Sequence, residues 1–275
     1  WPKKDADEDI VDLHDHHYDG DVATWMYLPR KINTNGSMGK WERVENLRAQ
    51  PGSQSKGGGR WYPTLVILPN GEVLAVGGHP TISDDYNGRH NNNTPERYAP
   101  GADSWALLDQ ELSAPNARVN DSYPRLHLLP NGKVYFATSR GSVGKKRRYH
   151  PYAGTFDGPD IVDPAEGIYH VGQDCTSVML PLLPPNYTPR ILLSNGLQAI
   201  RINPDDAAPQ WVQASSRQGG AAGTPRHHAC SVILPTGKVL VSGGVTSPGQ
   251  PKEPVLGAEI YDPGEFEASP VVRRA

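Results

Sequence analysis

The chain has 275 residues, a formal net charge of −3 and 36% hydrophobic residues. A mean hydropathy of −0.58, with no run near the roughly 18 apolar residues that cross a bilayer, excludes a membrane-spanning protein. The acidic balance argues against a general nucleic-acid binder, and the one basic run, Lys145–Arg148, is predicted to be a solvated loop or strand edge. The 29 glycines and 27 prolines favour one large all-β domain with many turns.

Residues 1–18 form an acidic and histidine-rich leading segment, and the polar start at Trp1 does not resemble a signal peptide. We therefore expect either a mature form or an excerpt of a longer protein. His14, His16, His17 and Asp19 could hold a metal ion, although a loop of the following domain is the favoured interpretation. The sequence predicts that residues 19–275 form this domain, beginning with an outer strand pair around Thr24–Trp41.

A tight hairpin then recurs along the chain. In each copy an apolar strand leads into a Leu-Pro-x-Gly turn, in which proline fixes φ and a later residue tolerates positive φ, and a β-branched strand returns. The turns begin at Leu68, Leu129 and Leu234, and a degenerate copy runs from Ser177 to Gly196. The strands that precede the three clear turns are predicted at Thr64–Leu68, Arg125–Leu129 and Ser231–Leu234.

A second motif follows each hairpin: a tyrosine or isoleucine, one residue, a proline, and an aromatic residue further on. The proline is predicted to end one strand, and the aromatic residue to start the next strand and pack between sheets. The copies are Tyr27 with Trp41, Tyr98 with Trp105, Tyr149 with Phe156, Ile202 with Trp211, and Tyr261 with Phe266.

The period of these two motifs predicts a kelch-type β-propeller. The turn prolines Pro69, Pro130, Pro184 and Pro235 recur at about the 50-residue period of kelch blades. A β-sandwich also has many short strands, but it does not repeat one hairpin at a fixed period. About four to five blades are represented, so the domain is predicted to be incomplete at both ends, and the rest of the ring would come from another segment or chain.

Two cysteines and four glycosylation sequons bear on the compartment. Cys175 and Cys230 could form one disulfide or stay as buried thiols. The sequons begin at Asn35, Asn92, Asn120 and Asn186, all in stretches predicted to be loops. They indicate an extracellular or cell-surface location.

At Gly59-Arg-Trp-Tyr-Pro-Thr64, followed by Leu68-Pro-Asn-Gly71 and Val76-Gly-Gly78, the sequence resembles the galactose oxidase and glyoxal oxidase family. Ser122-Tyr-Pro124 and Pro225-Arg-His-His-Ala-Cys-Ser231 fit later blades of that family, so the resemblance spans nearly everything from Asp19 to Tyr261. It implies a seven-bladed kelch propeller that holds one mononuclear copper.

The resemblance also implies the chemistry. In the family the tyrosine of Arg-Trp-Tyr-Pro, here Tyr62, ligates copper and is joined through a thioether to a cysteine one blade earlier. The modified phenol holds a radical, so that protein and copper together oxidise a primary alcohol or aldehyde while dioxygen becomes hydrogen peroxide. Tyr62 is therefore the candidate catalytic, cofactor-binding and copper-ligating residue.

The chain departs from the family pattern in its other ligands. No cysteine precedes Tyr62, so the thioether is not supported within this chain, and the Tyr-His pair and the last histidine ligand are expected beyond Ala275. His227 and His228 could overlay the Tyr-His pair. The motif Gly257–Pro263 fits the preceding blade instead, so both histidines are predicted to be structural.

Two classes of function therefore stay open. The chain is a large part of a copper-radical oxidase if the missing cysteine and Tyr-His ligands exist outside it. Alternatively, it is a non-catalytic kelch propeller that binds a glycan or a protein, or a structural surface protein, because a fold does not fix a function.

Overall fold

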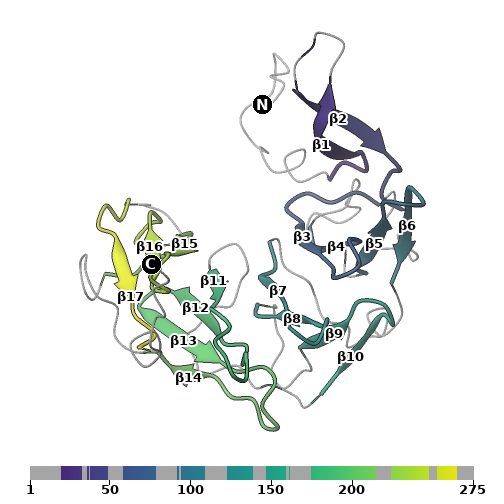
Figure 1. The fold of residues 1–275 in the computed structure, drawn as a ribbon. Coiled ribbons are helices and arrows are strands. Elements are labelled where there is room, and N and C mark those ends of the chain that lie inside the picture. Colours follow the sequence, from purple (N-terminus) through teal and green to yellow (C-terminus); the bar gives the residue numbers. More distant parts are fainter. Residues whose placement is uncertain are drawn as a thin grey trace, which may run out of the picture. The chain divides into compact units, whose positions relative to one another are not determined.

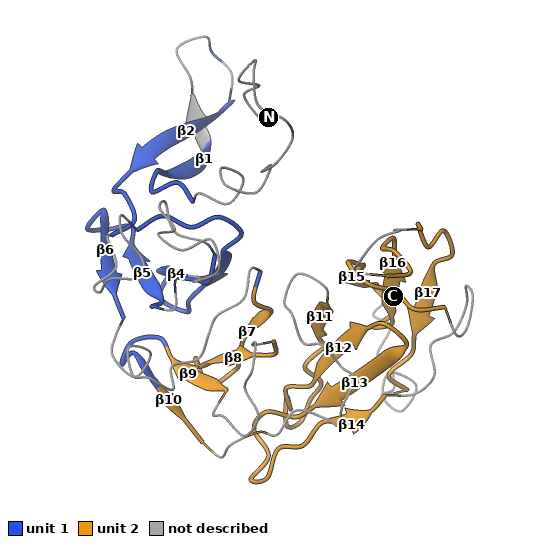
Figure 2. Cartoon of the chain, turned by 180° about the vertical axis from the view of Figure 1, so that it is seen from behind, with its two compact units in different colours: residues 1–123, 151–155 blue, residues 124–150, 156–275 orange. Residues whose placement is uncertain are grey.

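The computed structural model describes residues 20–32, 36, 38–48, 58–78, 92, 94–108, 123–138, 147–158, 161, 175–214, 224–247 and 253–264. Every named element in these ranges is a β-strand (Figure 1), and none of them contains a helix able to span a membrane. The leading segment 1–18, with its histidines, lies outside the described residues. The chain divides into two compact units, residues 1–123 with 151–155 and residues 124–150 with 156–275 (Figure 2).

Unit 1 contains two antiparallel sheets. In the first, β1 (Thr24–Ile32) pairs with β2 (Met38–Val44). The second has four strands in sequence order: β3 (Thr64–Ile67), β4 (Val73–Val76), β5 (Glu96–Ala99) and β6 (Ser104–Leu107). Each strand lies beside its neighbour in the sequence, so this sheet is a meander.

Unit 2 contains three further sheets built in the same way. The strands of the first are β7 (Leu126–Leu128), β8 (Val134–Phe136), β9 (Arg148–His150) and β10 (Thr155–Asp157). Those of the second are β11 (Thr176–Met179), β12 (Ile191–Asn195), β13 (Gln198–Ile202) and β14 (Val212–Gln213). The third has β15 (Cys230–Ile233), β16 (Val239–Ser242) and β17 (Glu259–Tyr261).

The Leu-Pro-x-Gly turns form as the sequence predicts. Between β3 and β4 the amide of Gly71 donates to the carbonyl of Leu68 at 2.9 Å, and Gly71 adopts φ +85°, a conformation that glycine adopts without steric cost. The same bond recurs from Gly132 to Leu129 and from Gly237 to Leu234. In the degenerate copy, β11 and β12 pair in register across a longer connection. All four predicted hairpins are therefore confirmed.

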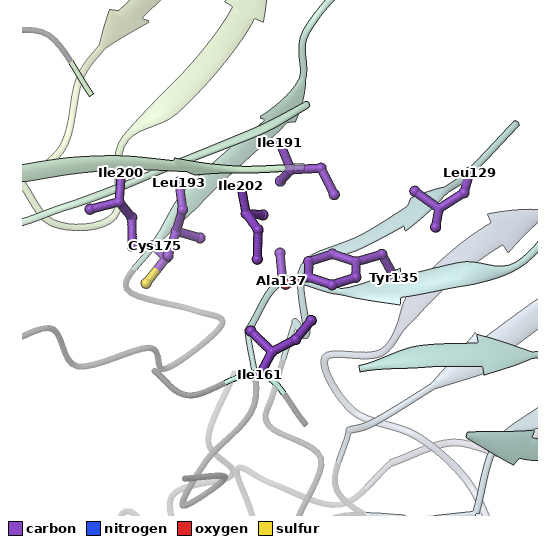
Figure 3. Close-up of a cluster of buried hydrophobic side chains, with 9 residues drawn as sticks. All are labelled: Leu129, Tyr135, Ala137, Ile161, Cys175, Ile191, Leu193, Ile200 and Ile202. Carbon is purple, nitrogen blue, oxygen red and sulfur yellow. The ribbon is translucent and has the colours of Figure 1, made fainter. Parts of the chain in front are cut away.

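Apolar side chains join neighbouring sheets within unit 2 (Figure 3). One buried cluster takes Leu129, Tyr135 and Ala137 from the sheet that contains β8, and the side chains of Cys175, Ile191, Leu193, Ile200 and Ile202 from the sheet that contains β12. Trp211 packs against the cluster, and the centroid of its ring lies 6.5 Å from that of Tyr135. In this copy of the second motif the aromatic residue thus packs between sheets, as predicted, whereas Trp41 of another copy is 62% exposed.

Both cysteines are free thiols, so the predicted alternative of a disulfide is wrong. Cys175 belongs to the buried cluster, whereas Cys230 is exposed at the start of β15.

Two local predictions are also wrong. Pro29 does not end its strand, because β1 continues to Ile32 and accommodates the proline at a register shift between Leu28 and Ile32, where a ladder hydrogen bond is not needed. The basic run is not entirely solvated. Arg147 is fully buried, and its guanidinium donates to the carbonyls of Phe136 and Ala137 at 3.3 and 3.4 Å. These carbonyls accept hydrogen bonds that the buried guanidinium would otherwise make to water.

Candidate active site

Tyr62 lies at the approach to β3, the first strand of its sheet, in an unusual backbone conformation. Its φ is +65°, and Tyr123 before β7 and His228 before β15 have φ of +52° and +55°. A left-handed conformation costs a residue with a Cβ about 1–3 kcal/mol, so it persists only where the surroundings impose it. The same position at three of the four hairpins is therefore held by local structure rather than by the identity of one side chain.

A buried ion pair holds the backbone just before Tyr62. The guanidinium of Arg60 lies 2.8 Å from Oε1 of Glu96 on β5, and both side chains are almost completely buried. Arg60 also donates to the carbonyls of Gly77 and Thr94. Burial lowers the pKa of Arg60, while the charge and hydrogen bond of Glu96 act in the opposite direction. The Arg60 side chain thus ties the approach to β3 to the ends of β4 and β5.

Close backbone packing completes this support. A Cβ on Gly78 would lie 2.7 Å from the carbonyl oxygen of Trp61 and 3.1 Å from the nitrogen of Pro63. Only glycine therefore allows the end of β4 to approach the segment that carries Tyr62. The fully buried Asn92 donates its side-chain amide to the carbonyl of Gly59. The sequon at Asn92 is consequently closed to a glycan, whereas Asn186 is exposed.

The ring of Tyr62 contacts two other aromatic rings. The centroid of Trp61 lies 3.4 Å from that of Tyr62, and the centroid of Tyr123 lies 4.4 Å from it, both with nearly parallel planes. The amide of Tyr123 also donates to the carbonyl of Tyr62 at 2.8 Å. Stacked aromatic rings add to the packing of a side chain, so Trp61 and Tyr123 help to hold the plane of the Tyr62 ring.

His227 and His228 lie in unit 2, at a second site of the same kind. Arg226 pairs with Glu259 on β17 at 3.0 Å, and both side chains are buried. Nδ1 of His227 lies 2.7 Å from Oδ1 of Asn195. Because that oxygen only accepts, Nδ1 carries the hydrogen and fixes the tautomer. The amide and carbonyl of His227 also bond to Val245. These contacts hold the His227 side chain and backbone in place, and the structural role of His227 and His228 stays a prediction.

His127 on β7 is a third histidine with a defined environment. Its Nε2 lies 2.7 Å from Oγ of Ser177, and that hydroxyl donates to the carbonyl of Leu192 at 3.0 Å. His127 therefore donates to Ser177. Burial, and to a smaller extent the nearby positive charge of Arg125, lowers the pKa of His127 to about 4. A serine whose hydrogen is already committed to a carbonyl is not an activated nucleophile, so this pair is structural.

Within the described residues, no three His, Cys, Asp or Glu side chains gather closely enough to hold a metal ion. Tyrosine is not among these residue types, so Tyr62 as a copper ligand stays a prediction.

The sequence did not reveal that Tyr123 stacks on Tyr62, nor which glutamates are the partners of Arg60 and Arg226. Their signals are nevertheless present. A Tyr-Pro pair stands at Tyr62 and again at Tyr123, and a glutamate stands two residues before the motif tyrosine at Glu96 and at Glu259. A buried glutamate at that position marks the partner of the arginine at the approach to the first strand.

Known proteins resemble this chain in sequence and in fold. It is 28% identical over 103 residues to an aldehyde oxidase GLOX of Vitis pseudoreticulata, which covers 38% of this chain and 16% of that protein. It is 25% identical over 278 aligned positions to a WSC domain-containing protein of Arthroderma benhamiae, which covers 88% of this chain and 28% of that protein. No protein-family model matches the chain.

A solved fungal alcohol oxidase of the AA5 family, in complex with copper, matches with a TM-score of 0.54 at 17% identity. The match covers 82% of this chain and 44% of the oxidase. The all-β, propeller-like fold is thereby confirmed, as is the resemblance to glyoxal oxidase predicted from the motif around Tyr62. The chain spans less than a third of the two curated relatives.

Proposed function

We propose that this chain is the tyrosine-bearing part of an extracellular protein similar to galactose and glyoxal oxidases. Such a protein would oxidise a primary alcohol or an aldehyde and reduce dioxygen to hydrogen peroxide. The observation that carries the proposal is Tyr62, which is held at positive φ in an Arg-Trp-Tyr-Pro segment and stacks against Trp61 and Tyr123. The similarity to an aldehyde oxidase and to a copper-containing alcohol oxidase supports it.

Tyr62 is the one copper ligand that this proposal places within the described residues. A phenol whose ring is covered by stacked aromatic rings suits a redox-active ligand. The described residues do not complete a copper site around it, and the proposal assigns the remaining ligands to polypeptide outside these 275 residues. Bound copper would accept one electron of the two-electron oxidation. Tyr62 would contribute a phenol whose position is fixed by stacking against Trp61 and Tyr123.

Mass and metal content of the native gene product test this proposal. Joining a cysteine sulfur to the Tyr62 ring removes the thiol hydrogen and one ring hydrogen, which dioxygen takes up as an oxidant. We therefore expect a protein lighter by two hydrogens, with one copper per chain and copper-dependent release of peroxide from alcohols or aldehydes. An unmodified Tyr62 in a copper-loaded protein would overturn the proposal.

Substitution gives a second test with a matched control. Tyr62→Phe removes only the phenolic oxygen, so we expect the copper content and the peroxide release to fall together while the fold persists. Tyr187→Phe makes the same change at another tyrosine with positive φ, exposed in the turn between β11 and β12, and should leave both unchanged. Equal behaviour of the two variants would refute the role of Tyr62.

A second candidate function is supported by the sequence itself. No cysteine precedes Tyr62, and a kelch propeller without the modified tyrosine would act as a binding or structural protein. Such a protein would hold a glycan or a protein through loops on one face. Binding to a glycan array by copper-free protein, together with an unmodified Tyr62, would favour this function over the oxidase.

A further inference from the structure

The segment before β1 lies beside the segment that carries Tyr62. Asp21 forms an isolated antiparallel bridge with Arg60, in which the amide of Arg60 donates to the carbonyl of Asp21 at 3.1 Å. One residue later, the carbonyl of Val22 accepts from the amide of Leu47 at 2.9 Å. Residues 20–22 are therefore fixed against residues 47 and 60 before the chain enters β1.

The direction of this bridge determines where the preceding residues lead. In an antiparallel pair, the residues before one partner run alongside the residues after the other. The chain N-terminal to Asp21 is therefore directed toward Tyr62, which stands two residues after Arg60. Asp19 and His17 stand two and four residues before Asp21. Because four extended residues span about 13 Å, both are close enough in the sequence to reach the surroundings of Tyr62.

The residues that lead in this direction are rich in metal-binding side chains. Three histidines and one aspartate stand in residues 14–19. Imidazole nitrogens suit Cu²⁺ and Zn²⁺, and a carboxylate oxygen is a further ligand of such ions. The neutral imidazole is the form that binds a metal, and histidine is largely neutral at pH 7. These residues lie outside the described ranges, so their role is inferred from the sequence and from the course of the chain at Asp21.

We propose that the histidine-rich segment 14–19 binds one divalent cation of the Cu²⁺ or Zn²⁺ class beside the segment that carries Tyr62. Its ligands are the imidazoles of His14, His16 and His17 and the carboxylate of Asp19. The phenol of Tyr62 is not a ligand, so this site is separate from the copper of the proposed function. Its position suits a site that takes up copper before the copper passes to Tyr62. That role rests on the proposed function, whereas binding of the cation does not.

Copper titration of the metal-free native gene product tests this proposal. It is carried out in the Tyr62→Phe variant, which lacks the phenol of the proposed oxidase site. Electron paramagnetic resonance detects imidazole nitrogens bound to Cu²⁺, and we expect a nitrogen-coordinated signal from the segment. The triple variant His14→Asn, His16→Asn, His17→Asn should lose this signal. His17→Asn alone should weaken binding by more than the roughly tenfold that loss of an outer-shell partner costs.

His150→Asn is the matched control. His150 is exposed at the end of β9 and belongs to no metal-capable cluster in the described part of the chain, so its loss should leave the Cu²⁺ affinity unchanged. Equal affinities of the triple variant and the His150→Asn variant would overturn the proposal. Because Tyr62→Phe keeps the cation of the segment and removes the copper of the oxidase site, failure of the one is distinguishable from failure of the other.

Metal-directed oxidation tests where the cation lies. Bound copper that ascorbate has reduced converts added hydrogen peroxide into an oxidant that attacks side chains close to the metal, and mass spectrometry locates the products. Trp61 is only partly exposed, whereas Trp41 is 62% exposed, so a freely diffusing oxidant attacks Trp41 faster. We expect more oxidation of Trp61 than of Trp41 with the unchanged segment, and the reverse in the triple variant. A preference for Trp41 in both would overturn the position beside Tyr62.

Discussion

Replacement of Glu96 by glutamine should destabilise the protein strongly, because it leaves the charge of Arg60 buried without its partner. The Arg60–Glu96 distance is 2.8 Å, and the two side chains are 1% and 0% exposed. Breaking a buried ion pair on one side costs about 3–5 kcal/mol. The carbonyls of Gly77 and Thr94 still accept from Arg60 in the variant, so we expect a loss near the lower end, about 3 kcal/mol.

Urea unfolding followed by circular dichroism measures this loss. Glu72→Gln is the matched control, because it makes the same change in a pair with Arg97 whose side chains are each 21% exposed, and such a pair contributes about 0–1 kcal/mol. The double variant Arg60→Met with Glu96→Met should regain part of the loss, since it removes both buried charges. If Glu96→Gln cost no more than Glu72→Gln, the inference that the Arg60–Glu96 pair holds the approach to Tyr62 would be refuted.

Three further predictions follow from residues outside the ion pair. Since an unfolded histidine titrates near 6.5 and folded His127 near 4, the unfolded state binds more protons between these values. The unfolding free energy should therefore fall by up to about 3 kcal/mol as the pH drops from 6.5 to 4, and His127→Asn should flatten this dependence in urea titrations. Gly78→Ala should lower the melting temperature more than Gly71→Ala, because both have positive φ but only Gly78 meets backbone atoms; equal shifts would contradict the close packing. In protein secreted from a eukaryotic host, peptide mapping should find a glycan on Asn186 and none on Asn92, and glycosylated Asn92 would show that its burial is wrong.

The hairpins were predictable because their signals are local. A Leu-Pro-x-Gly turn determines its own hydrogen bonds, so β3, β7 and β15 lie within one or two residues of their predicted bounds. The aromatic pairs of β1 and β5 follow from the same short-range pattern. In contrast, Pro29 shows the limit of this approach, because its effect depends on whether its strand edge needs a hydrogen bond.

The site was harder to predict, because its contacts join residues distant in the sequence. Arg60 meets Glu96 only when β5 lies beside β4, and Tyr62 meets Tyr123 only when two approach segments come together. The sequence motif singled out Tyr62, and its role as a copper ligand stays a prediction. Its positive φ could not be predicted, since the strain is imposed by contacts with other strands, from Gly78 after β4 and from Glu96 on β5, the partner of Arg60.

Tyr62, Tyr123 and His228 share one backbone conformation although their side chains differ. The backbone at this position is therefore independent of the chemistry of the side chain. At Tyr62 and His228 the segment is held by a buried arginine two residues earlier, together with a glutamate and a glycine from neighbouring strands. None of these contacts depends on which side chain the held residue bears. A substitution at this position can therefore replace a phenol by an imidazole while the contacts that hold the backbone stay the same. Side chains of different chemistry could therefore be introduced at this position during evolution, in one hairpin independently of the others.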